Sequence, residues 1–205
     1  RTTTYGDNVY KYVEKSEYDQ SEYVIKETSY TIKDDKEILN THSDYIYTIV
    51  NGKQVLARDN YYYYNSDGKA ILSSYYEYGY DENANQIGEV YYNVDSEGNA
   101  KPSSTCEKSY VKRGDWWDTQ KYLSYTFRDG EKIPSYGYEY VYNDKGQRTK
   151  YIDYSGDGKN WKIESYTVYH NTDLGNTGVK DATKQVEAHR TYNGENQCIE
   201  YNHDN

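Results

Sequence analysis

A regular series of turn signals is the feature of this sequence that most restricts its fold. Gly or Ala stands at 52, 68, 84, 98, 114, 130 and 146, in most cases shortly after Asn or Asp, and successive differences are 16, 16, 14, 16, 16 and 16. Asn-Gly and Asp-Gly reach positive φ at low cost, as tight hairpins require. The spacing therefore predicts a hairpin turn about every sixteen residues.

The stretches between these turns are typical of long β-strands. Segments such as AILSSYYEYGY and KIPSYGYEYVY are rich in Tyr, Val and Ile and contain no internal turn signal. Reversal at each turn lays successive strands antiparallel. We therefore predict an all-β fold, a long-stranded antiparallel β-meander with a strand-plus-turn repeat of about sixteen residues. Aromatic side chains on both faces of the strands leave two forms open, a curled open sheet and a closed barrel.

Tyrosine has to supply most of the apolar surface of this chain. Leu, Ile, Val and Phe together make up well under one fifth of the sequence, which at a net charge of −10 is typical of disorder. The 31 tyrosines reverse that expectation, because a Tyr ring offers as much buriable area as Phe and needs only a partner for its hydroxyl. We expect a fold built on tyrosine that tolerates partly wet surfaces.

The repeat predicts a single all-β domain over residues 1–205 with three stretches. Residues 1–44 follow the sixteen-residue spacing less clearly, 45–170 hold the regular hairpins, and 171–205 hold a loop and a last hairpin. The polar insertion at 171–181 is the best candidate for a mobile loop, and such loops often have functional roles.

Charge and segment composition indicate an exported chain with few classes of partner. A pI near 4.9 would repel phosphates and anionic headgroups, so we expect no nucleic-acid binding, and no apolar run approaches the length of a membrane span. The polar opening RTTTYGDNVY and the absence of Met are typical of a mature chain without its signal peptide, although an arbitrary chain boundary would look the same. Cys106 and Cys198 have no metal or redox spacing, and a disulfide and two buried thiols stay equally open.

Two resemblances to known families support an extracytoplasmic β-structure. The motif Tyr-x-Tyr-Asx-x-x-Gly-polar at 140–147 is similar to the YD repeat of bacterial Rhs-type surface and toxin-shell proteins, in which long antiparallel strands wind into a spiral sheet. Residues 62–69 match it too, as do 78–85 with Ala84 for Gly and 92–99 with Val94 for the second Tyr. In overall texture the chain also resembles the uncharacterised Tyr-rich secreted proteins of gut Bacteroidetes. That resemblance implies export and no known activity.

Exposed aromatic rings are the candidate ligand-binding groups. Trp116 and Trp117 lie beside Asp115 and Asp118, and flat rings flanked by carboxylates suit stacking against sugars. Neighbouring residues on a strand face opposite ways, so only one of the pair can join a given surface. The candidate binding residues are Trp116, Trp117, Trp161, Tyr62 and Tyr64.

A calcium site is the one cofactor that a motif indicates. Asp153, Ser155 and Asp157, with Glu164 at the twelfth position, nearly match the spacing of an EF-hand loop. Ser155 departs from the preferred Asp or Asn, and both flanks are typical of strands instead of helices. A hairpin turn at 156–158 explains the same residues.

The sequence predicts no catalytic residue. It contains no GxSxG, P-loop, GxGxxG or Cys-His pair, and abundant carboxylates single out no glycosidase pair. We therefore expect a non-enzymatic extracytoplasmic module that binds a glycan or protein at the cell surface or serves as a structural element. The alternatives are a hydrolase acting on polysaccharide and a scaffold stiffened by Ca²⁺.

Overall fold

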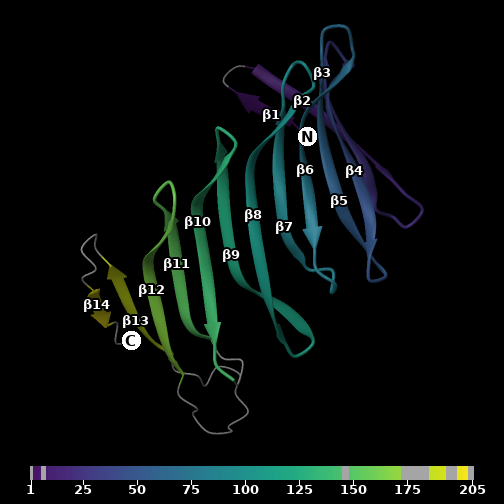
Figure 1. The fold of residues 1–205 in the computed structure, drawn as a ribbon. Helices are drawn as coiled ribbons and strands as arrows, with labels where there is room; N and C mark the ends of the chain where they lie inside the picture. Colours follow the sequence, from purple (N-terminus) through teal and green to yellow (C-terminus); the bar gives the residue numbers. More distant parts are fainter. Residues whose placement is uncertain (1, 6–7, 145–147, 172–184, 193–197, 203–205) are drawn as a thin grey trace. The chain divides into compact units, whose positions relative to one another are not determined.

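A computed structural model gives the fold of the chain. It describes the backbone of residues 2–5, 8–144, 148–171, 185–192 and 198–202, and the side chains of residues 12–144 and 148–168 (Figure 1). These residues form strands and turns, with no helix among them. The strands are β1 (Thr2–Tyr5), β2 (Asn8–Tyr18), β3 (Val24–Lys33), β4 (Lys36–Val50), β5 (Lys53–Tyr64), β6 (Ala70–Tyr80), β7 (Gln86–Val94), β8 (Ala100–Arg113), β9 (Trp116–Arg128), β10 (Glu131–Tyr142), β11 (Arg148–Gly156), β12 (Trp161–Asn171), β13 (Gln185–Tyr192) and β14 (Cys198–Asn202).

The chain divides into two compact units. Unit 1 comprises residues 1–104 and unit 2 residues 105–205, so the boundary falls inside β8. In each unit the strands follow one another in chain order and pair antiparallel, as a meander does. The three stretches of the expected single domain stay a prediction, and residues 172–181 of the expected loop lie outside the described residues.

The predicted all-β antiparallel meander is confirmed, and its closed-barrel form is wrong. Among the described residues of each unit, pairing joins consecutive strands only, and no pairing joins a unit's first strand to its last. The sheet of each unit is therefore open. In unit 1, for example, β4 pairs with β5 from Val50 opposite Lys53 to Thr41 opposite Tyr63.

Three hairpin turns share one hydrogen-bonding geometry. Asn65, Asp81 and Asp95 each accept, at Oδ1, hydrogen bonds from the backbone N–H groups two and four residues later, over 2.8–3.1 Å. The residue three positions later adopts positive φ, which is 72° at Gly68, 64° at Ala84 and 85° at Gly98. The Asx side chain thus closes each turn and supplies the polar signal that the sixteen-residue spacing detects.

A fourth turn of this kind has no glycine and was not predicted. Asp19 accepts hydrogen bonds from the backbone N–H groups of Ser21 and Tyr23 at 2.8 and 2.9 Å, and Glu22 has a φ of 65°. Because Glu occupies the left-handed position here, a search for Asx followed by Gly misses the turn between β2 and β3.

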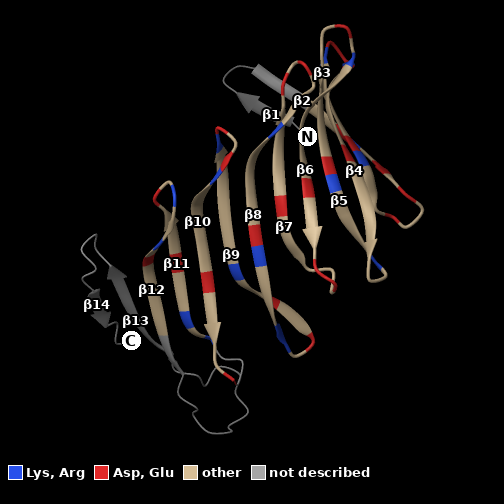
Figure 2. Cartoon of the chain, viewed as in Figure 1, with Lys and Arg blue, Asp and Glu red and all other residues tan. Residues whose placement is uncertain are grey.

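Among the residues whose side chains the structure describes, neither unit has a conventional apolar core. No large side chain among the described residues is fully buried. In unit 1 the buried side chains are Thr28, His42, Asn60 and Ser74, all of them polar, and unit 2 buries Cys106, Ile152, Tyr166 and Thr167. Charged residues of both signs are scattered along the strands, and acidic residues lie in many of the hairpin turns (Figure 2).

Tyrosine rings pack across neighbouring strands in place of a core. The rings of Tyr75 and Tyr92 stack at 4.6 Å between centroids, and those of Tyr76 and Tyr91 contact at 4.7 Å. The Arg58 guanidinium lies 3.7 Å from the centroid of Tyr75. Each such aromatic or cation–π contact contributes about 0.5 to 1.5 kcal/mol, so the sheet is stabilised by many local pairs.

The Ala84→Gly substitution should stabilise the protein. Left-handed backbone costs an L-residue roughly 1 to 2 kcal/mol, and the gain is reduced by the greater freedom of Gly in the unfolded chain. We expect the free energy of unfolding to rise by about 1 kcal/mol in urea denaturation. The control Ala70→Gly, in the first residue of β6, should lower it. A loss of stability in Ala84→Gly would contradict the turn geometry.

Candidate functional site

The tyrosine run that ends β5 presents two different faces. The ring of Tyr62 stacks on His42 at 4.4 Å with an interplanar angle of 5°, and Tyr64 contacts the same imidazole at 5.3 Å. Tyr61 and Tyr63 alternate to the opposite face and keep 42% and 43% of their surface exposed. The structure thus brings the predicted residues Tyr62 and Tyr64 together around His42, and leaves Tyr61 and Tyr63 more accessible to a ligand.

Short polar side chains lie beside Tyr61 and Tyr63 on their face of the sheet. Thr41 of β4 pairs with Tyr63, and Ser43 pairs with Tyr61. The same two cross-strand rows continue into β3 and β2, as Ser29 and Glu14 in one row and Glu27 and Ser16 in the other. Small side chains in adjacent rows leave space that larger residues would fill.

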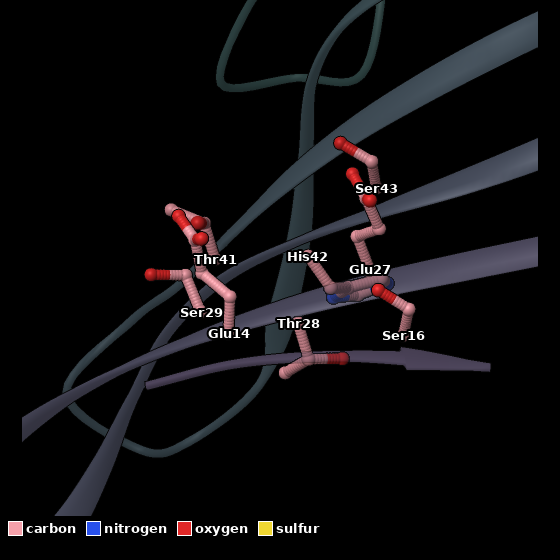
Figure 3. Close-up of a pocket in the computed structure, with 8 residues that line it drawn as sticks. All are labelled: Glu14, Ser16, Glu27, Thr28, Ser29, Thr41, His42 and Ser43. Atoms are coloured by element: carbon pink, nitrogen blue, oxygen red, sulfur yellow. The ribbon is translucent and has the colours of Figure 1, made fainter. Parts of the chain in front are cut away.

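That space is a hollow of about 260 Å³, which we call the polar hollow. Figure 3 shows Glu14, Ser29 and Thr41 gathered on one side and Ser16, Glu27 and Ser43 on the other. Thr28 and His42 lie on the strands between the two groups, and alternation directs their side chains to the opposite face, so they form the floor. The polar hollow thus offers several hydroxyl groups and two carboxylates next to two exposed phenol rings.

Glu27 gives this face a negative electrostatic field. It accepts a hydrogen bond from the Tyr45 hydroxyl at 2.7 Å. Burial, and then this bond to Glu27, raises the pKa of Tyr45 above its ordinary value. Burial and the charge of Glu27 also raise the pKa of Asp59, which is paired with Tyr45 in the register. The buried Oδ1 of Asp59 has no hydrogen-bond partner among the described residues.

The side chain of His42 lies on the face of the sheet opposite to the polar hollow. Its side chain is 6% exposed, its Nε2 lies 3.6 Å from Oδ2 of Asp44, and its buried Nδ1 has no hydrogen-bond partner among the described residues. Burial, and then the charge of Lys26, lowers the pKa of this imidazole. His42 is therefore neutral at pH 7 and can stack flat on Tyr62 without a desolvated charge.

The structure separates the three tryptophans of the sequence prediction. Trp116 is 62% exposed at the start of β9, and Trp117 is 36% exposed with the Lys112 ammonium 6.0 Å from its ring. Trp161 begins β12 and contacts Tyr125 edge-on at 5.3 Å. Tyr125 follows Trp117 by eight residues on β9, which places it about 26 Å from Trp117 along the strand, and Trp161 contacts Tyr125. Trp117 and Trp161 therefore do not share one small site.

Trp161 belongs to a packed aromatic group of unit 2. Its ring also meets Tyr154 at 6.3 Å, and the Tyr154 hydroxyl donates to Glu139 at 2.8 Å. Burial and this bond raise the pKa of Tyr154 to about 12. Lys121 completes the group with a 2.9 Å ion pair to Glu139. Trp161 thus stabilises the sheet through its neighbours.

The residues of the predicted calcium loop form a hairpin. Asp153 of β11 accepts hydrogen bonds from the hydroxyls of Tyr151 at 2.6 Å and Ser165 at 3.0 Å. Ser155 lies on the same strand, Asp157 accepts backbone hydrogen bonds in the turn that follows, and Glu164 is exposed in β12. In the described part of the chain, no three His, Cys, Asp or Glu residues are grouped to hold a metal ion. The calcium site stays a prediction.

Two further features bear on the sequence predictions. Cys106 is 3% exposed in β8, whereas the side chain of Cys198 lies outside the described residues, so their pairing stays open. Over the residues that the structure describes, no helix has the length and apolar character needed to cross a membrane.

Sequence reasoning missed the polar hollow, although a signal for it exists. Three successive strands each contain a polar residue, one intervening residue and then Ser: Glu14-Lys15-Ser16, Glu27-Thr28-Ser29 and Thr41-His42-Ser43. Such i, i+2 pairs place both side chains on one face of a strand. Only the cross-strand register shows that the three pairs lie side by side.

Comparisons with solved structures give distant likenesses. A protein with unknown function from Bacteroides fragilis matches at TM-score 0.41 and 16% identity, over 62% of this chain and 91% of that one. A porin-like protein from Bacteroides uniformis matches at TM-score 0.26 and 11% identity, over 86% and 87%. The structure of TcdB2-TccC3-Cdc42 matches at TM-score 0.23 and 9% identity, over 94% of this chain and 14% of that one.

These likenesses show neither a family nor a function for this chain. The predicted resemblance to Bacteroidetes proteins is confirmed in part, because two of the similar structures come from Bacteroides species. No protein-family model matches the sequence, and no curated protein matches it.

The Asp59→Asn substitution should stabilise the protein at neutral pH. A raised pKa means that folding disfavours the ionised carboxyl, so the cost is absent below the unfolded pKa near 4 and fully present above the folded pKa. Because Asp59 is only half-buried, solvent screening limits the gain to about 1 kcal/mol or less. Urea denaturation at pH 7 should show the gain, which should vanish towards pH 4.

Asp95→Asn is the matched control with the opposite sign. Backbone hydrogen bonding from Asn99 lowers the pKa of Asp95, so the ionised form stabilises the fold above the unfolded pKa, and this contribution is lost as pH falls through the folded pKa. Its replacement by Asn should give no gain at pH 7. An equal gain in both variants would show that net charge, and not the setting of Asp59, is the cause.

Proposed function

We propose that this chain is a non-enzymatic extracytoplasmic binding module, and that its ligand is a glycan held by the polar hollow and the rings of Tyr61 and Tyr63. One observation carries the proposal. Two exposed phenol rings share a face with a hollow of about 260 Å³ whose sides are hydroxyls and carboxylates. A sugar ring has an apolar face that can stack on a flat aromatic ring and hydroxyl groups that can bond to convergent polar groups. This combination of groups therefore suits a sugar.

The geometry supports a preformed site. Tyr61, Tyr63, Thr41 and Ser43 are held by the paired strands β4 and β5, and so need no loop to close over a ligand. Side chains fixed on paired strands lose little conformational entropy on binding. A sugar ring could therefore stack on a phenol while its hydroxyls donate to Glu27 and exchange hydrogen bonds with the serine and threonine hydroxyls.

The expected extracytoplasmic location agrees with a cell-surface glycan as partner. That location rests on the Tyr-rich, acidic composition and on the resemblance to the Tyr-rich secreted proteins of gut Bacteroidetes. A protein partner remains the alternative occupant of the same face, because Tyr is also enriched in protein interfaces. The two are separated by whether free oligosaccharide binds.

A hydrolase acting on polysaccharide is the second candidate function. The observation that favours it is Asp59, whose pKa is raised by burial and by the charge of Glu27, since a glycosidase pairs a raised-pKa acid with an ionised carboxylate. Incubation with oligosaccharides should release no new reducing ends. Release that Asp59→Asn abolishes would favour the hydrolase.

Tyr61→Ala and Tyr63→Ala should each weaken glycan binding about 3- to 10-fold, because each removes a stacking contact of about 0.5 to 1.5 kcal/mol. Ligands are first found on a glycan array with the labelled chain, and affinities are then measured by NMR titration with the free sugar. Tyr136→Ala is the control, since this tyrosine of unit 2 is similarly exposed, at 47%. The proposal fails if no glycan binds, or if Tyr136→Ala loses as much affinity.

A further inference from the structure

The two carboxylates of the polar hollow lie in neighbouring rows of the sheet. Glu14 is paired with Ser29, and Glu27 is paired with Ser16, so the two glutamates are diagonal neighbours on adjacent strands. Diagonal neighbours of this kind are about 7–8 Å apart. A ligand in the hollow therefore meets negative charge from both rows.

The lysines next to these glutamates in sequence do not neutralise them. Lys15 and Lys26 alternate to the opposite face and form ion pairs there, with Glu37 at 2.5 Å and with Asp44 at 3.9 Å. The hydrogen bond that Glu27 accepts comes from the neutral hydroxyl of Tyr45. No lysine or arginine is among the residues that line the hollow in the described part of the chain.

The negative charge of Glu27 affects the pKa values of neighbouring side chains on this face. The charge of Glu27 contributes to the raised pKa of both Tyr45 and Asp59, after burial in each case. Both pKa values are thus shifted towards the protonated form, as burial and a nearby negative charge require. An anionic ligand would encounter the same repulsion, and the net charge of −10 adds to it at long range.

The size of the hollow limits the ligand to about one sugar ring. Its volume of about 260 Å³ lies below the range of roughly 300–1,000 Å³ found for drug-sized ligands. Within it, a sugar hydroxyl or an ammonium group can donate to either glutamate, and an ammonium group adds the attraction between opposite charges. A sugar carboxylate can donate to neither.

We propose that the polar hollow selects its sugar by charge, binding amino sugars and neutral sugars and refusing uronic acids, with Glu14 and Glu27 as the residues that determine this specificity. The inference rests on the proposed function, because it names the class of glycan that the same site takes. Tyr61 and Tyr63 provide stacking for any of these rings, so the glutamates alone set the preference.

Three probes that share one ring test the selection. Glucosamine, methyl glucoside and glucuronic acid are titrated against the full chain by NMR at pH 7 and low salt, and the galactose series is run in parallel. We expect glucosamine to bind at least about 5-fold more tightly than methyl glucoside, and glucuronic acid at least about 5-fold more weakly, which corresponds to about 1 kcal/mol for each charge difference. The differences should shrink as salt is raised.

Glu14→Gln and Glu27→Gln should each reduce the affinity for glucosamine and increase the affinity for glucuronic acid. The affinities of the three probes should therefore differ less than in the unchanged protein. Glu17→Gln is the matched control, because it removes one charge from β2 on the opposite face, where Glu17 pairs with Lys26. Equal binding of the three probes, or equal effects of the Glu17 and Glu27 variants, would overturn the charge selection. If the three probes bind equally and Tyr61→Ala still weakens their binding, the proposed glycan site stands, whereas no binding of any probe overturns both proposals.

Discussion

Pairing between neighbouring strands is the interaction on which the rest of this structure depends. Within each unit, the described strands pack against their chain neighbours and against no second layer of the same unit. Side chains that would normally meet across a core must find partners within one sheet. The chain meets that need with tyrosine, whose ring packs sideways on the next strand while its hydroxyl reaches a carboxylate or a backbone carbonyl.

The hydroxyls of the tyrosine rings make this arrangement possible. Tyr47 donates to the carbonyl of Val24 at 2.9 Å, and Tyr80 donates to that of Leu56 at 2.8 Å. Each of these hydrogen bonds joins a tyrosine side chain to the backbone of a neighbouring strand, and so it helps to hold the two strands together. A phenylalanine in the same place would leave an apolar edge in water, because no second layer among the described residues of the same unit covers it.

An uncovered sheet gives every strand two faces that can differ in role. In β5 the tyrosines that stack on His42 stabilise unit 1, while their alternates stay exposed beside the polar hollow. The half-buried carboxyl of Asp59 lies on the exposed face with an oxygen that has no partner among the described residues. A polar group kept at such a cost is more typical of a binding surface than of a structural one.

The sequence was sufficient for local features and insufficient for those that depend on register. The sixteen-residue turn spacing and the alternation of Tyr61 to Tyr64 could be predicted, because turns and strand faces are set by residues close together in the chain. The turn at Asp19 was missed because Glu22 replaces the expected glycine. The polar hollow and the separation of Trp117 from Trp161 depend on which residues of different strands lie opposite each other.

The heat capacity change of unfolding, measured by calorimetry on the full chain, tests most directly the claim that both units are open sheets without a core. Globular proteins give about 12–15 cal/mol/K per residue, because unfolding exposes buried apolar surface. An open sheet with polar buried residues should give a value below about 10 cal/mol/K per residue. A value of about 14 or more would mean that the faces are covered, which would contradict the fold described and close the polar hollow to a ligand.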